Sequence, residues 1–362
     1  MTQPIQISGR TIGPEAPCFI AAEIGINHNG DLDLARDMVR AAAAAGADGV
    51  KFQNYSTEDF LSDRTLTYTY RSQGREISES QWEMFRRCEF QPGWLGSLAQ
   101  LCESVGVVFF ATPTSERGVR ELVELHAPLI KNGSDYLTHI PLLEVMGSTG
   151  IPVILSTGMA DECDIDEAVA AVRRGGPSDI ILLHCTSLYP TPPTETNLRR
   201  MTSLMDRYHV LVGFSDHTEG WVAATQAVTL GARFIEKHFT IDHQLPGPDH
   251  WFSSTPEEFA EFVRTVRLAE QRLGRWELQP ARQEAEGRRE YRISAAAARD
   301  LRVGERLGLG MIAYRRPGIG ILPKDTYSYL GREIVVPIAK GTPLQPDQFG
   351  IVSRLARAES KG

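Results

Sequence analysis

The chain has 362 residues, of which 42% are hydrophobic and 23% are charged, as in ordinary soluble globular proteins. Its formal net charge of -8 excludes a general attraction to nucleic acid or to an anionic membrane, and no apolar run approaches the roughly 18 residues of a membrane-spanning helix. The N-terminus lacks a basic region followed by an apolar core, so we expect no signal peptide. Five cysteines without a CxxC pair indicate reduced thiols and a cytoplasmic location.

Short apolar segments alternate with helical patterns from residue 18 to residue 273. The expected strands are Cys18–Ala22, Gly49–Gln53, Val107–Ala111, Pro128–Lys131, Pro152–Leu155, Ile180–Leu183, Val210–Phe214 and Ala232–Ile235. The expected helices are 31–45, 81–88, 94–104, 115–125, 141–149, 164–174, 198–208, 220–230 and 256–273. Eight strands in this alternation favour a (β/α)8 TIM barrel over an open sheet. We expect a short β-ribbon before the barrel, and a long loop at about 54–79.

The pattern changes after about Leu273. We expect the barrel to occupy residues 1–275, followed by a charged linker at 276–290, a small module at 291–355 and a tail at 356–362. The apolar runs of the module are short and bounded by glycine and proline, so it is too small for a second enzyme core.

Polar side chains stand at or just past the carboxyl end of each expected strand. These residues are Glu23, Lys51, Gln53, Thr112, Lys131, Ser156, Ser187, Ser215, His217 and His238. In a (β/α)8 barrel this end of the strands carries the chemistry, so we predict an active site there.

Lysines and small hydroxyl residues at this end indicate an anion site. Lys51, Lys131 and Lys237 end three strands, and a buried lysine is costly unless it meets an anion or acts as a nucleophile. The hydroxyl groups that suit phosphate oxygens belong to Thr112, Ser134, Ser156, Ser187 and Ser215. Each serine alone could equally cap a turn or a helix, but the group favours an anion.

Two histidines follow neighbouring strands and could share a metal ion, although either could instead be a hydrogen-bonded core residue. They are His217 and His238, and further ligands could come from Glu23 or Asp249. Two imidazole ligands that leave coordination positions open to water and other oxygen ligands suit Mn²⁺, or else Mg²⁺ or Co²⁺, better than they suit a closed structural zinc ion. Glu23 is a candidate general base, or alternatively the partner of a lysine at the same end of the barrel.

Long motifs occur in order over Pro17–Leu273 and resemble the N-acetylneuraminate synthase family, which includes sialic, legionaminic and pseudaminic acid synthases and spore-coat polysaccharide homologues. The motifs are Ala22–Gly30, Val50–Gln53, Leu155–Met159, His184–Thr191, Phe214–Thr218, Glu236–Thr240 and Gly247–Asp249. Tyr314–Gly320 is similar to the antifreeze-like (SAF) domain that these enzymes carry after the barrel.

This resemblance implies a transferase that condenses phosphoenolpyruvate with an open-chain aldose such as N-acetylmannosamine. C3 of phosphoenolpyruvate adds to the aldehyde, water attacks C2, and phosphate leaves an α-keto sugar acid. Phosphoenolpyruvate would bind to Lys51, Thr112, Lys131, Ser134, Ser156, Ser187 and Ser215. The metal would bind to His217 and His238, and Glu23 would position or deprotonate the water. The sugar would meet Gln53, Tyr189, Asp249 and Arg316, the last from the other subunit of a domain-swapped homodimer.

The chain departs from the family pattern after the fourth strand, where members often read Lys-Ile-Gly/Pro-Ser-Gly-Glu and the glutamate binds the acceptor sugar. Here the run is Lys131-Asn-Gly-Ser-Asp-Tyr136. Tyr136 replaces the glutamate, with Asp135 beside it. Either Asp135 takes over the role, or the acceptor lacks the group that the glutamate recognises.

Two other functions remain open from the sequence. A Schiff-base aldolase would use Lys131 or Lys237 as its nucleophile. A binding protein would use the antifreeze-like module, with the barrel as a scaffold. The combined set of lysines, histidines and Glu23 argues against the binding protein, whereas borohydride trapping of a pyruvate–lysine adduct would distinguish the aldolase.

Overall fold

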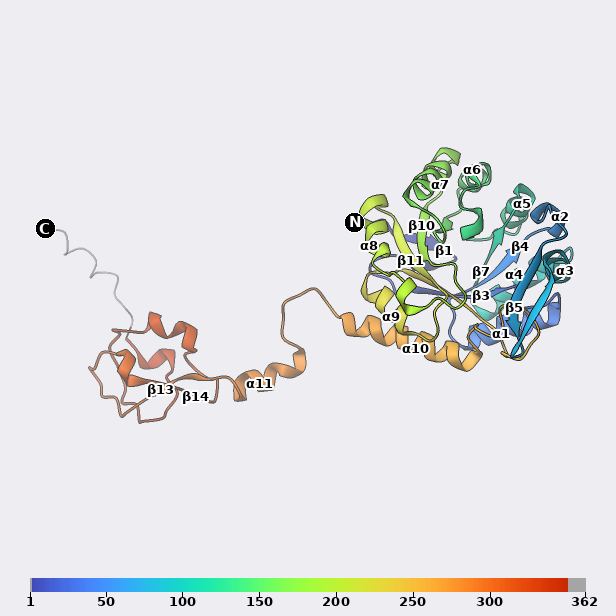
Figure 1. The fold of residues 1–362 in the computed structure, drawn as a ribbon. Helices are drawn as coiled ribbons and strands as arrows, with labels where there is room; N and C mark the ends of the chain where they lie inside the picture. Colours follow the sequence, from blue (N-terminus) through green and yellow to red (C-terminus); the bar gives the residue numbers. More distant parts are fainter. Residues whose placement is uncertain (1, 351–362) are drawn as a thin grey trace. The chain divides into compact units, whose positions relative to one another are not determined.

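The computed structural model describes residues 2–350, which divide into two compact units (Figure 1). The first unit ends at Gly274 and the second begins at Arg275. The end of the predicted module beyond residue 350 and the predicted tail at 356–362 lie outside the described residues.

The first unit contains a closed barrel of eight parallel strands, which confirms the predicted (β/α)8 fold. In barrel order the strands are β10 (Ile180–Cys185), β11 (Leu211–Asp216), β12 (Phe234–His238), β3 (Phe19–Gly25), β4 (Gly49–Asn54), β7 (Val108–Pro113), β8 (Ile130–Asn132) and β9 (Val153–Ser156). Several strands continue past their predicted ends, because polar residues there still pair with the next strand. His238 is opposite Glu23, and Glu23 is opposite Lys51. Three predicted site residues therefore stand side by side on β12, β3 and β4.

Helices surround the strands (Figure 1). They are α1 (Leu32–Ala44), α4 (Trp94–Val105), α5 (Glu116–Glu124), α6 (Ile140–Ser148), α7 (Glu162–Gly175), α8 (Arg200–Tyr208), α9 (Val222–Thr229) and α10 (Pro256–Leu273). Their ends follow local chemistry: the Asp31 side chain accepts from the backbone N–H groups of Asp33 and Leu34, and Thr255 forms a reciprocal cap with Glu258. The main hydrophobic core lies between these helices and the strands.

A second core fills the inside of the barrel and includes the N-terminal hairpin. This hairpin, β1 (Ile5–Ile7) and β2 (Arg10–Ile12), is antiparallel, as the predicted β-ribbon requires. Its Ile5, Ile7 and Ile12 belong to the same cluster as Phe19 and Phe234, which lie at the start of β3 and β12. The hairpin therefore seals the amino-terminal end of the barrel and leaves the carboxyl end for the site.

The segment that was expected to be a loop at about 54–79 is largely regular, so that prediction is wrong. It contains α2 (Thr57–Phe60) and the antiparallel strands β5 (Thr67–Ser72) and β6 (Arg75–Ser80), and it leads into α3 (Gln81–Cys88). Gln73 and Gly74 both have positive φ and form the tight two-residue turn of the hairpin. One face of the hairpin carries Tyr68, Tyr70 and Ile77, but Ile77 is the single aliphatic residue of the two strands, so the alternation that marks a half-buried strand is weak.

The second unit has a small hydrophobic core of its own. The segment predicted as a linker contains a short helix, α11 (Ala285–Glu290), and an antiparallel pair follows, β13 (Ser294–Ala297) and β14 (Ile312–Arg315). Its core residues are Ala295, Ala297, Leu301, Leu307, Ile321, Ile334, Ile338, Leu344 and Phe349.

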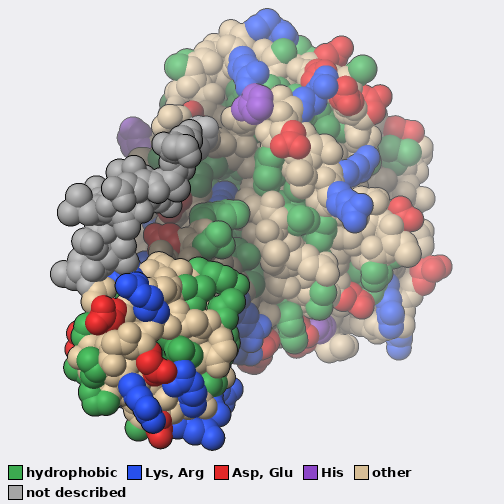
Figure 2. Space-filling model, turned by 90° about the vertical axis from the view of Figure 1, so that its left-hand side faces the viewer, with side chains coloured by type: hydrophobic (Ala, Val, Ile, Leu, Met, Phe, Trp, Pro, Cys, Tyr) green, Lys and Arg blue, Asp and Glu red, His purple; other side chains and the backbone are tan. Residues whose placement is uncertain are grey.

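Charged side chains of both signs are interspersed on the face of the molecule shown in Figure 2. Within residues 2–350, no helix is both long enough and apolar enough to cross a membrane.

Gly213 of β11 has no space for a Cβ atom, so it provides a test of the packing inside the barrel. A Cβ atom there would collide with the carbonyl oxygen of Phe234 and would lie 2.7 Å from Cδ2 of Leu183. We expect Gly213→Ala to lower the free energy of unfolding by about 1–3 kcal/mol, because a backbone carbonyl cannot move aside. Gly96→Ala, on α4 and without a close contact, should raise it slightly. Equal urea midpoints for Gly213→Ala and the unmodified chain would refute this packing.

Candidate active site

A cavity of about 710 Å³ opens at the carboxyl ends of the barrel strands. Every site residue predicted within the barrel, apart from Lys237, lines it. These residues are Glu23, Lys51, Gln53, Thr112, Lys131, Ser134, Asp135, Tyr136, Ser156, Ser187, Tyr189, Ser215, His217, His238 and Asp249. Arg316 belongs to the second unit, where its side chain is exposed, and its contact with the sugar stays a prediction.

The floor of the cavity is a buried cluster of alternating charges. Nζ of Lys51 lies 3.0 Å from Oε1 of Glu23 and 3.5 Å from Oε1 of Glu236. Nζ of Lys131 lies 3.5 Å from the same Glu236 oxygen. Lys51 also donates to the hydroxyl of Thr112 at 3.2 Å. Glu236 therefore joins the two lysines, although sequence reasoning gave it no role. Four buried charges need this mutual pairing, because each alone would cost several kcal/mol.

Four polar atoms at this floor are buried without a hydrogen-bond partner among residues 2–350. They are Oε2 of Glu23, Oε2 of Glu236, Oγ of Ser156 and Nδ1 of His238. Buried polar atoms in folded proteins are almost always paired. Unpaired atoms from four different residues, all lining one cavity, indicate that ligand atoms complete the site.

The lining carries more negative than positive charge. Two lysines, Lys51 and Lys131, face four carboxylates, those of Glu23, Asp135, Glu236 and Asp249. Burial raises the pKa of Glu23 to about 7, against the effect of Lys51. Burial likewise raises the pKa of Asp249 to about 6, against the effect of His217. A cation in the cavity would offset this excess of negative charge and would favour the binding of an anion.

The two histidines are close enough to act together. Their ring centroids lie 5.4 Å apart, and Tyr189 packs 4.2 Å from His217. Nδ1 of His217 donates to the carbonyl of Thr186 at 2.9 Å, which leaves its Nε2 as the free ring nitrogen. Burial holds the pKa of His238 well below its usual value, so this ring is neutral and its unpaired Nδ1 can donate a lone pair.

These features fit a divalent cation. Two free imidazole nitrogens and an excess of negative charge form a suitable donor set. No three His, Cys, Asp or Glu side chains gather as ligands within the described part of the chain, so water or substrate oxygens would complete the shell. Burial opposes the charged form of His217, but Cys185, the Thr186 carbonyl and Glu236 together outweigh burial and raise the pKa of His217. A cation would therefore compete with a proton at this histidine.

Lys237 does not join this site, which corrects the predicted group of three lysines. Its Nζ lies 3.1 Å from Oδ2 of Asp216 and donates to the carbonyl of Thr218 at 2.6 Å. Successive side chains of a strand point to opposite sides, and Glu236 and His238 line the cavity. Lys237 between them therefore points away from it.

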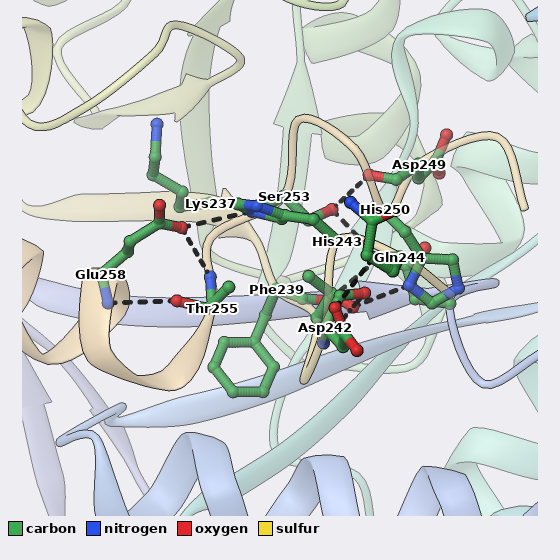
Figure 3. Close-up of polar contacts among 12 residues, drawn as sticks. Lys237, Phe239, Asp242, His243, Gln244, Asp249, His250, Ser253, Thr255 and Glu258 are labelled. Carbon is green, nitrogen blue, oxygen red and sulfur yellow. Dashed lines mark hydrogen bonds and ion pairs between the residues drawn. The ribbon is translucent and has the colours of Figure 1, made fainter. Parts of the chain in front are cut away.

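The loop between β12 and α10 carries Asp249 and is fastened by polar contacts (Figure 3). Nδ1 of His250 lies 2.7 Å from the hydroxyl of Thr240, and Nε2 of His250 lies 3.1 Å from the side-chain amide of Asn29. The amide of Asn27 donates to the hydroxyl of Ser253 at 3.0 Å. The motif Ala22–Gly30 thus holds the loop at two points. It fixes Asp249 at the cavity, with Oδ2 3.9 Å from Nδ1 of His238.

Comparison with known proteins agrees with the fold and with the motifs. The model of the NeuB family matches residues 38–278, and that of the SAF domain matches residues 292–350. The chain is 38% identical to N,N'-diacetyllegionaminic acid synthase of Legionella pneumophila, over 92% of this chain and 94% of that protein. It is 34% identical to N-acetylneuraminate-9-phosphate synthase of Homo sapiens, over 91% of this chain and 92% of that protein.

A solved structure supports the same relationship. The N-acetylneuraminic acid synthetase of Leptospira borgpetersenii, in complex with citrate, is 33% identical with a TM-score of 0.71, and the match covers 79% of this chain and 95% of that chain. The resemblance predicted from the motifs is confirmed. The chain is therefore an enzyme of the NeuB family, with a SAF domain after its barrel.

Proposed function

We propose that the enzyme condenses phosphoenolpyruvate with the aldehyde of an open-chain aldose, giving an α-keto sugar acid and phosphate. The observation that carries this proposal is the cavity floor, where two buried lysines stand among unpaired polar atoms. The relatives named for the synthesis of N,N'-diacetyllegionaminic acid and N-acetylneuraminate 9-phosphate support it.

Phosphoenolpyruvate would bind at the floor through the two lysines and the surrounding hydroxyl groups. Lys51 and Lys131 would supply the positive charge. The hydroxyls belong to Thr112, Ser134, Ser156, Ser187 and Ser215, all of which line the cavity. Glu236 holds both ammonium groups in place, so their positions are set before the substrate arrives.

The reaction forms one carbon–carbon bond and one carbon–oxygen bond, and it breaks the carbon–oxygen bond to the phosphate. C3 of phosphoenolpyruvate attacks the aldehyde carbon, a water oxygen adds to C2, and phosphate leaves from C2. Glu23 would take the proton from this water. Its Oε1 is held by Lys51 at 3.0 Å and by Gln53 at 3.3 Å, whereas its Oε2 is unpaired. One oxygen thus fixes the carboxylate and the other is free to act as a base.

His217 and His238 would hold the divalent metal, Mn²⁺ before Mg²⁺ or Co²⁺. When bound, this ion would act as a Lewis acid that polarises the aldehyde of the acceptor. The acceptor would contact Gln53, Asp135, Tyr136, Tyr189 and Asp249. In a domain-swapped homodimer, Arg316 of the partner subunit would also reach it.

A Schiff-base aldolase is the alternative that one observation favours. Burial lowers the pKa of Lys131, as a nucleophilic lysine requires. Its amine is nevertheless paired with Glu236, so we prefer a role in anion binding. Borohydride reduction in the presence of pyruvate separates the two readings, because a covalent adduct on Lys131 would contradict the condensing synthase. Membership of an enzyme family leaves no support for a binding protein that uses the SAF domain alone.

The first test of the site concerns the metal. We expect His238→Ala to weaken Mn²⁺ binding by at least about tenfold and to abolish phosphate release, because one of the two imidazole ligands is lost. Equilibrium dialysis with Mn²⁺ measures the first effect, and thermal unfolding with a chelator checks that the fold is intact. The exposed His126, changed to Asn, is the matched control. Unchanged Mn²⁺ binding by His238→Ala would remove the metal assignment.

The second test concerns the base. Because burial raises the pKa of Glu23 to about 7, the carboxylate form is lost as the pH falls through 7, and kcat/KM should fall with it. Glu23→Gln should lower kcat by about a hundredfold or more and should remove this limb of the profile. Glu124→Gln, at an exposed position on α5, should leave the profile unchanged. A limb near pH 7 that persists in Glu23→Gln would assign it to another group.

The third test concerns the SAF domain. If Arg316 contacts the acceptor, Arg316→Ala should raise the KM for the aldose by about tenfold or more and should change the KM for phosphoenolpyruvate less than about twofold. The neighbouring exposed Arg315, changed to Ala, is the control. Equal increases in both KM values would argue against a role of Arg316 in acceptor binding.

A further inference from the structure

The two histidines proposed as metal ligands are held by their backbones to different degrees. His238 is the last residue of β12 and is paired with Glu23 of β3. His217 follows β11, whose ladder with β12 ends at the pair of Asp216 and Lys237. The separation of the two imidazole rings, 5.4 Å between centroids, therefore depends on more than the backbone pairing of these strands.

A buried side-chain link continues where this ladder ends. Nζ of Lys237 lies 3.1 Å from Oδ2 of Asp216 and donates to the carbonyl of Thr218 at 2.6 Å. The other carboxylate oxygen of Asp216 accepts from the backbone N–H of Thr218 at 2.8 Å and from its hydroxyl at 2.7 Å. One carboxylate and one ammonium group thus bracket His217 on both sides along the chain and fasten it to β12.

The loop after β10 holds His217 from the other direction. The backbone N–H of Thr191 donates to the carbonyl of His217 at 2.8 Å, and Nδ1 of His217 donates to the carbonyl of Thr186 at 2.9 Å. These contacts orient the imidazole relative to β10. The link through Lys237 orients it relative to β12, the strand that carries His238.

Stability alone does not account for a charged link at this position. The side chains of Asp216 and Lys237 are 0% and 4% exposed. A buried ion pair loses hydration that the mutual attraction offsets only in part, and well-packed apolar side chains stabilise the same space at least as well. Lys237 already packs near Phe262, with Nζ 5.5 Å from the ring centroid, so an apolar side chain would find apolar contacts there.

Resting on the proposed metal site, we propose that Lys237 and Asp216 are positioning residues, which hold His217 at the distance from His238 that a shared divalent cation requires. Both side chains act from outside the cavity, because neither lines it. Residues that orient metal ligands from behind typically change the affinity for the metal by about 10–100-fold when they are replaced. Lys237 then has a function in the site although it does not face the substrates.

Replacement of Lys237 separates positioning from charge. Lys237→Met removes a positive charge near the metal site, so a purely electrostatic role predicts tighter Mn²⁺ binding. We instead expect equilibrium dialysis to show Mn²⁺ binding weakened by about tenfold or more, because His217 is no longer fastened to β12. Asp216→Asn, which keeps the shape of the side chain, should weaken it too. The affinity for phosphoenolpyruvate without metal, measured by calorimetry, should stay the same.

The double variant, with Asp216→Asn and Lys237→Met together, keeps the test decisive where a single variant fails to fold. It leaves neither charge of the pair buried alone, so its thermal midpoint should recover most of what the single variants lose. Its Mn²⁺ affinity should nevertheless stay low, because the link to the Thr218 carbonyl is still missing. Arg267→Met is the matched control. It breaks an ion pair with Asp48, at the amino-terminal end of the barrel, and should lower the thermal midpoint without changing Mn²⁺ affinity.

The possible failures are distinguishable from one another. Mn²⁺ binding by Lys237→Met that equals or exceeds that of the unmodified chain would overturn the inference and keep the proposed metal site. Recovery of Mn²⁺ affinity together with the thermal midpoint in the double variant would assign the pair to stability alone. If the unmodified chain itself bound no Mn²⁺, the proposed metal site would fail, and the inference with it.

Discussion

The cluster of Glu23, Lys51, Lys131 and Glu236 is the feature on which the rest of the site depends. Its members come from four strands, β3, β4, β8 and β12, so it assembles only when the barrel closes between β12 and β3. All four side chains are buried, and removal of one partner of such a pair costs about 3–5 kcal/mol. Well-packed apolar side chains would stabilise the same space at least as well. We therefore attribute the cluster to ligand binding rather than to stability.

The charge of the cavity couples its ligands to one another. With two lysines and four carboxylates in the lining, an anion alone meets net repulsion, and burial already raises the pKa of Glu23 and Asp249. A divalent cation at His217 and His238 would relieve this repulsion and favour the binding of phosphoenolpyruvate. By linkage the anion would favour the cation to the same extent.

The sequence predicted the barrel and most of the cavity because the end of a strand is marked by an apolar run followed by polar residues. Glu23 and His238 lie at or just past the ends of apolar runs and Lys51 lies within one, and parallel strands bring such positions to one end of the barrel. The position of Lys237 at a strand end does not decide which way its side chain points, because side chains alternate along β12. Glu236 and His238 face the cavity, so Lys237 between them faces away. Glu236 was missed for the same reason.

Strands with few apolar residues, and features that depend on contacts between distant segments, could not be predicted from the sequence. The hairpin of β5 and β6 is local, but Ile77 is the single aliphatic residue of its strands, so their apolar alternation is weak. The rings of Phe60, Phe85 and Tyr136, which line one part of the cavity, are spread over 77 positions of the sequence and meet only in the folded chain. The link from His250 to Asn29 spans still more of the chain.

The fate of the oxygen atoms tests the central claim most directly. The reaction is run in water labelled with heavy oxygen, with phosphoenolpyruvate, Mn²⁺ and a panel of N-acetylated and plain aldoses. The released phosphate is analysed by mass spectrometry. Condensation with attack of water on C2 predicts unlabelled phosphate, released only with an acceptor and in equal amount to a new α-keto acid. Labelled phosphate, or release that does not need an acceptor, would contradict it.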